Sequence, residues 1–166
     1  LDYPFEEVAD CWVGSRSCSA KCVCDEGYAG KVCEYGEEDY AVKKQAREDG
    51  LTALKFLILL QDGSETEIVG SIRTLASLTQ FPEEMSVISA TVALDVVDVI
   101  IDLVQVTPVS REALFQLLRP LDDISVALSF YVASVSRLKE AVDAIGYMVV
   151  SEMVVGEAPV AHKTGS

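Results

Sequence analysis

The chain has 166 residues, half of them apolar, and its 27 acidic residues against 13 basic ones give a net charge of −14. A phosphate backbone would be repelled by this charge, which excludes nucleic acid as a partner. The longest apolar stretches, 51–60 and 85–106, are respectively too short and interrupted by acidic residues. We therefore expect no membrane span in this sequence.

The cysteines divide the chain into two parts. All five lie in the first 33 residues, and the remaining 133 residues have none. This distribution predicts a small disulfide-stapled module over 1–36 and a larger domain over 37–160 that folds without staples. Residues 161–166 then form a tail or lead into a following domain. Disulfides form in oxidising compartments, so we expect an extracellular or cell-surface protein.

Residues 22–33 follow the pattern C-x-C-x-x-G-Y-x-x-x-x-C. Cys22 and Cys24 are separated by a single residue, so we expect each to bridge to a different segment rather than to the other. Gly27 and Gly30 allow the positive-φ turns that let the chain double back, and Tyr28 is expected to cover the small hairpin. The pattern resembles the C-terminal half of an EGF-like domain.

The resemblance implies a pairing scheme. In EGF-like domains the last two cysteines pair, which implies a Cys24–Cys33 disulfide. If Cys22 is the fourth cysteine of the pattern, its partner is most simply Cys11. Cys18 then has no partner, which suggests a bridge to another chain or to an upstream cysteine. Trp12 beside the first cysteine is either an interface anchor or packed against its own disulfide.

Metal sites are disfavoured in this cysteine-rich part. A zinc site formed by Cys18, Cys22, Cys24 and Cys33 is the alternative to disulfides, but zinc sites usually use C-x2-C to C-x4-C spacing rather than C-x-C. Residues 5–10 are only a degenerate version of the acidic sequence that precedes the first cysteine of calcium-binding EGF domains. We predict no metal ion and no cofactor.

After an acidic joint at 34–40 the apolar residues follow a helical period. A first helix is expected over 40–60 and ends at Asp62–Gly63. Ser64 and Glu67 form a capping box that starts a second helix. The expected core-facing residues are Leu51, Leu54, Leu57 and Ile58 on the first helix and Ile68, Ile72, Leu75 and Leu78 on the second.

Pro82 is expected to open a third helix that runs to about residue 105, and Ser110 to cap a short fourth helix through 118. A long final helix is expected from Pro120 to about residue 155, with a weak point at Gly146. The Val-rich run 96–101 could also be a strand, but its length and the lack of hairpin glycines favour helix. The predicted fold is therefore an EGF-like module plus an all-α domain of about five helices.

Acidic residues recur at helical spacing on the third helix. Asp95, Asp98 and Asp102 share one face, which could hold a hard cation, pair with basic residues of a partner, or simply be solvated. Asp122 and Asp123 are interpreted as caps of the final helix.

A second resemblance covers about residues 64–160. Residues 72–80, the Pro82-Glu-Glu-Met-Ser segment that opens an Ala/Val/Leu helix, and the end at 154–160 look like the helical subdomain of the GAIN domain. That domain occurs in adhesion-type receptors and polycystin-like proteins. The resemblance implies a segment of a large extracellular protein. The family's self-cleavage motif matches no residue of this chain, so no catalytic residue is carried over.

We expect a non-enzymatic protein. The single histidine, His162, lies in the expected tail, and no catalytic motif is present. The predicted helices are apolar around more than half their circumference, so protein partners are expected, either copies of the chain or adjacent domains. The chain has no initiator Met and is interpreted as a fragment of a larger structural or adhesion protein. Alternatives are a ligand-binding or signal-transmitting segment of a membrane receptor and an accessory region of a secreted enzyme.

Overall fold

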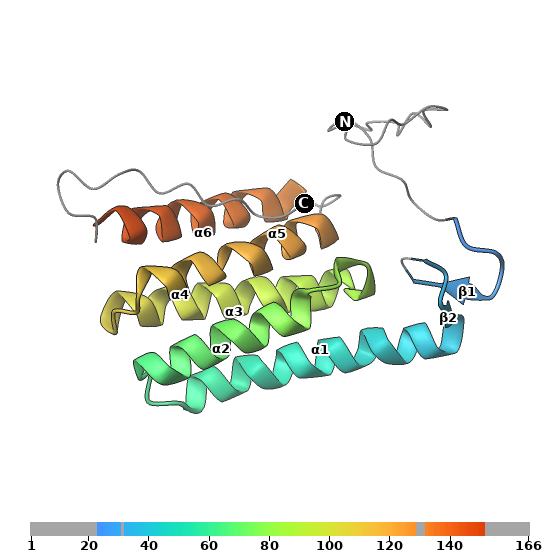
Figure 1. Cartoon of the computed structure of the whole chain (residues 1–166), viewed down its shortest axis with the longest axis horizontal. Helices are drawn as coiled ribbons and strands as arrows, with labels where there is room; N and C mark the ends of the chain where they lie inside the picture. Colours follow the sequence, from blue (N-terminus) through green and yellow to red (C-terminus); the bar gives the residue numbers. More distant parts are fainter. Residues whose placement is uncertain (1–22, 31, 129–131, 152–166) are drawn as a thin grey trace. The chain divides into compact units, whose positions relative to one another are not determined.

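The computed structural model describes residues 23–30, 32–128 and 132–151 (Figure 1). The chain divides into two compact units, and the division falls between Tyr40 and Ala41. The first unit contains a small hairpin, and the second consists of helices. The predicted all-α character of the larger part is therefore confirmed.

The hairpin of the first unit has two short antiparallel strands, β1 (Tyr28–Ala29) and β2 (Tyr35–Gly36). Tyr28 lies opposite Gly36, and Ala29 lies opposite Tyr35. Gly27 and Gly30 have φ values of 88° and 103°, so both supply the positive φ that the sequence predicted. The hairpin is the part of the predicted EGF-like module that lies within the described residues. Cys11, Trp12, Cys18 and Cys22 lie outside them.

The helices begin and end largely where the sequence signals predict. Their bounds are α1 (Glu37–Leu60), α2 (Glu65–Thr79), the 3-10 turn η1 (Pro82–Glu84), α3 (Val87–Val106), α4 (Arg111–Gln116), α5 (Leu118–Ala127) and α6 (Val132–Ser151).

Three helix boundaries depend on residues that the sequence identified. Gly63 has a φ of 72° and lies in the turn after α1. Before α2, the Ser64 backbone N–H donates to the Glu67 carboxylate at 3.3 Å, which completes the predicted capping box. Ser110 caps α4 by accepting a hydrogen bond from the Ala113 N–H at 3.3 Å. These three predictions are confirmed.

The start of the third helix was predicted five residues too early. Pro82 opens only the turn η1, and α3 begins at Val87. The Ser86 hydroxyl accepts a hydrogen bond from the Ser89 N–H at 3.0 Å and so caps α3. Both positions carry start signals, and the side-chain cap at Ser86 sets the α-helical boundary.

The long final helix predicted over 120–155 is wrong. It is replaced by α5 and α6, which lie next to one another in the bundle (Figure 1). Pro120 lies within the first turn of α5, where a missing N–H costs no helical hydrogen bond. Asp122 and Asp123 are inside α5 and do not cap it, because the helix begins at Leu118. Gly146 lies within α6 and does not interrupt it.

Helix α3 is at the centre of the helical unit, where it packs against α2, α5 and α6 (Figure 1). Most of its small apolar side chains are inaccessible, which explains why its sequence has so narrow a polar face. The least accessible are Ala90, Ala93, Leu94, Val96, Val97 and Ile100.

The predicted core faces of α1 and α2 are confirmed with one exception. Leu51, Leu54 and Ile58 are buried, whereas Leu57 is 52% exposed. Successive helical residues are rotated by about 100°, so a residue next to Ile58 lies at the edge of the buried stripe or outside it. On α2 the predicted residues are buried or packed against the core: Ile68, Ile72, Leu75 and Leu78.

Candidate functional site

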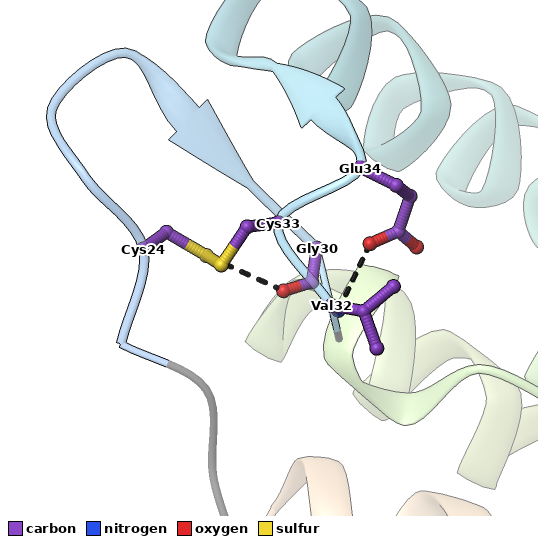
Figure 2. The surroundings of a disulfide bond; sticks show 5 residues. All are labelled: Cys24, Gly30, Val32, Cys33 and Glu34. Atoms are coloured by element: carbon purple, nitrogen blue, oxygen red, sulfur yellow. Dashed lines mark hydrogen bonds between the residues drawn. A yellow bond between two sulfur atoms is a disulfide. The ribbon is translucent and has the colours of Figure 1, made fainter.

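Cys24 and Cys33 form a disulfide that closes the hairpin, as Figure 2 shows. Their Cα atoms are 5.3 Å apart, within the usual range for a disulfide. Cys24 Sγ lies 3.7 Å from the Gly30 carbonyl oxygen. Because a disulfide sulfur carries no proton, this is a close contact in which the sulfur donates no hydrogen bond. The implied Cys24–Cys33 pairing is confirmed. Oxidised sulfurs are not thiolate ligands, so the alternative zinc site loses two of its four cysteines.

The tip of the hairpin is tightly packed around Gly30. A Cβ atom at this position would lie 2.7 Å from a carboxylate oxygen of Glu34 and 2.9 Å from the Tyr35 ring. The Glu34 carboxylate also accepts a hydrogen bond from the Val32 N–H at 2.9 Å (Figure 2). Cys33 itself has a φ of 60°, which is unfavourable for a residue with a Cβ. The disulfide and the glycine together hold this compact turn.

Two residues of the predicted acidic stripe on α3 form ion pairs within the chain. Asp95 accepts hydrogen bonds from Lys55 of α1 at 2.8 Å and from Arg137 of α6 at 2.7 Å. Asp98 accepts a second hydrogen bond from Arg137 at 2.5 Å. Asp102 is exposed. The stripe therefore joins α3 to two neighbouring helices: Asp95 and Asp98 pair with basic residues of their own chain, and the Asp98 side chain remains 47% exposed.

These ion pairs shift the titration of the groups that form them. Burial alone would raise the pKa of Asp95, but the hydrogen bonds and charges of Lys55 and Arg137 outweigh it and lower that pKa. The hydrogen bonds that Arg137 donates, first to Asp98 and then to Asp95, raise the pKa of Arg137. Because Asp95 ionises more readily in the folded chain, its charge contributes stability above the ordinary carboxyl range, and this stability is lost as the pH falls through the lowered pKa.

An Asp95→Asn variant should therefore be less stable than the wild type by about 1 kcal/mol at neutral pH, the scale of partly exposed ion pairs. The difference should shrink on acidification. Urea unfolding at neutral and acidic pH measures it, with Asp102→Asn as a control on the exposed part of the same helix. A difference between Asp95→Asn and wild type that stayed constant with pH would contradict the assignment.

A buried ion pair that the sequence did not predict joins α1 to η1. Arg47 Nε donates to the Glu84 carboxylate at 2.6 Å, and Arg47 Nη1 donates to the Leu78 carbonyl oxygen at 2.8 Å. The guanidinium carbon lies 5.0 Å from the centre of the Phe81 ring. Glu84 is 5% exposed. The negative charge of Glu84 is therefore balanced by Arg47, and Lys43 Nζ lies 4.0 Å from Glu84 Oε1 as a second cation.

The sequence contains a signal for this pair. Arg47 is four residues before Leu51 and so lies on the same face as the buried residues of α1. A basic residue on an apolar face needs an anionic partner. The partner could not be identified because it is 37 residues away in the sequence.

Asp123 on α5 is a half-buried carboxyl group with an unfavourable environment. Burial raises its pKa, the charges of Asp122 and Glu83 raise it further, and only Arg119 acts in the opposite direction. Its Oδ2 atom is buried and has no hydrogen-bond partner among the described residues. Perturbed carboxyl groups occur at functional sites but also in structural charge networks.

The outer face of α1 carries a row of exposed apolar side chains close to its C-terminal end. Phe56 is 63% exposed and Leu60 is 85% exposed. We call the following four residues the α1 apolar row: Phe56, Leu57, Leu59 and Leu60. The nearest charged residue before it, Lys55, is bound to Asp95. The α1 apolar row is therefore an uncharged patch on a strongly acidic protein.

None of the described helices combines the length and apolar character that crossing a bilayer requires. Among the described residues, His, Cys, Asp and Glu side chains form no cluster of three or more that could hold a metal ion. His162 and residues 5–10 lie outside the described part. Comparison of the chain with protein-family models, curated proteins and solved structures found no match.

Proposed function

We propose that this chain is a non-enzymatic extracellular structural or adhesion module, part of a larger surface or fibre protein, that acts through protein–protein contacts. The observation that carries the proposal is the α1 apolar row. Large apolar side chains that gather on one exposed face of a soluble domain mark interaction surfaces. A disulfide-closed hairpin directly before α1 supports an oxidising location.

The module order is consistent with this function. A disulfide-stapled hairpin followed by a helical domain is the arrangement that resembles an EGF-like module and the helical subdomain of a GAIN domain. This order suits a modular ectodomain or a component of an extracellular fibre. In this interpretation the hairpin and the helices set spacing, and the α1 apolar row makes the contact.

We propose a second copy of the chain as the occupant of the α1 apolar row. Two copies that each carry a charge of −14 repel one another over most of their surfaces. The α1 apolar row is uncharged, so a contact between two rows places no like charges directly against one another. A twofold axis would set the row of one copy against the same row of the other.

Sedimentation velocity over a range of protein concentrations tests this contact. We expect a concentration-dependent dimer, and Leu60→Glu should raise its dissociation constant at least tenfold because a charge buried in an apolar contact must be desolvated. Tyr147→Glu on α6 is the matched control, since Tyr147 is also exposed, at 77%. A wild-type chain that remains monomeric at all concentrations, or a Leu60→Glu dimer as tight as the wild type, would contradict the proposal.

A further inference from the structure

A cleft of about 680 Å³ lies among residues of α2, α4 and the first turn of α5. Helices α2 and α4 are neighbours in the bundle (Figure 1). The cleft is lined on the α2 side by Arg73 and Ala76. The residues that line its other side are Arg111, Glu112, Phe115, Gln116 and Arg119. Its volume is in the range of sites that hold small organic molecules, about 300–1,000 Å³.

The cleft is basic although the protein is acidic. Arg73, Arg111 and Arg119 come from three different helices and line it together with a single carboxylate, that of Glu112. The lining side chains carry three guanidinium groups and one carboxylate on a chain whose net charge is −14, and Asp123, on which the charge of Arg119 also acts, is not among them. An anion near the surface would therefore be attracted to this cleft and repelled by most other parts of the protein.

The cleft is lined by a large share of the arginines in the described residues. Only five arginines lie in the described part of the chain. Arg47 and Arg137 join helices through ion pairs with carboxylates. The other three all line the cleft. Arg73 and Arg119 are exposed, so their guanidinium groups are accessible to a ligand from solvent.

The remaining lining residues define the rest of the ligand. Phe115 is half-buried and packs against the core, and Ala76 lies across from it on α2. An apolar body can pack on these two side chains. A guanidinium group binds carboxylate and sulfate oxygens with two parallel hydrogen bonds and also stacks on flat rings.

We propose that the cleft binds a small organic anion, an aromatic or apolar body with a carboxylate or sulfate group held by Arg73 and Arg119. This site is separate from the α1 apolar row and does not depend on the proposed contact between copies. A small ligand fits better than a sulfated polysaccharide, because a long polyanion would extend beyond the cleft over the acidic remainder of the surface.

Fluorescence titration with 8-anilinonaphthalene-1-sulfonate tests the site, with 2-naphthoate as a competing carboxylate. We expect saturable binding at one site and displacement by 2-naphthoate. Arg73→Gln and Arg119→Gln should each weaken binding about tenfold or more, the effect of losing a charge-assisted hydrogen bond. Arg73→Lys should give an intermediate affinity because it keeps the charge but loses the planar fork.

Lys139→Gln is the matched control. Lys139 lines a separate groove between α5 and α6 and its replacement removes the same charge there. Circular dichroism must show that each variant is folded. The proposal is overturned if the arginine variants bind as tightly as the wild type, if Lys139→Gln alone loses binding, or if a sulfated polysaccharide binds and the two small anions do not.

Discussion

Replacement of Glu84 by alanine should destabilise the helical unit by roughly 3–5 kcal/mol, the cost of leaving one partner of a buried ion pair uncompensated. The Arg47 guanidinium would remain 14% exposed without the carboxylate that now accepts its hydrogen bonds. Urea unfolding followed by far-ultraviolet circular dichroism measures the loss. Glu84→Gln should also be destabilising, because the amide removes the charge that compensates Arg47.

Two further variants separate the ion pair from general effects of mutation. Glu140→Ala removes the same charge at an exposed position of α6 and should change stability by less than about 0.5 kcal/mol. The double variant Arg47→Met with Glu84→Leu should recover much of the loss, since apolar replacement of a buried pair is often neutral. A Glu84→Ala variant as stable as Glu140→Ala would show that the pair does not hold α1 to η1.

Replacement of Cys24 by serine should open the hairpin and leave the helices folded. Closing a loop of about ten residues stabilises a folded unit by roughly 3 kcal/mol in the chain-entropy account. The hairpin has only two residues in each strand, so little else can replace the bond. The helical unit has its own core and should keep its circular dichroism signal and its unfolding midpoint.

Limited proteolysis by trypsin under native conditions measures the opening, because Lys31 lies in the loop that the disulfide closes. Cleavage at this site should become faster in Cys24→Ser. Cys33→Ser and the double variant should behave like the single one, since all three remove the same bond. Loss of the helical signal in the same transition would contradict the division into two independent units.

The sequence predicted the features that local signals determine. The resemblance of residues 22–33 to an EGF-like domain implied the Cys24–Cys33 bond, Ser64 with Glu67 marked the start of α2, and periodicity identified the buried residues of the second helix. Each of these depends on residues within about ten positions of one another. Local signals failed at Pro82, because a proline can open either a 3-10 turn or an α-helix. The side-chain cap at Ser86 is what marks the start of α3.

The sequence predictions failed where the structure depends on contacts between residues that are far apart in the sequence. The segment between α5 and α6, 128–131, contains neither glycine nor proline, so nothing local predicted that one long helix would be two. The acidic stripe on α3 was visible, but its partners Lys55 and Arg137 are 40 and 42 residues from Asp95. The basic cleft likewise brings together arginines from three helices, which only the packing of those helices could show.

Mass spectrometry of the unreduced protein, purified from its own source and cleaved with trypsin, tests the central claim most directly. Cleavage after Lys21, Lys31 and Lys43 should release the peptides 22–31 and 32–43 joined by a disulfide, with peptide 1–16 attached to them through the expected Cys11–Cys22 bond. Fragmentation should place the bond to Cys33 at Cys24 rather than at Cys22. Reduction should separate them. Recovery of both peptides with free thiols would contradict an extracellular module built on a disulfide-closed hairpin.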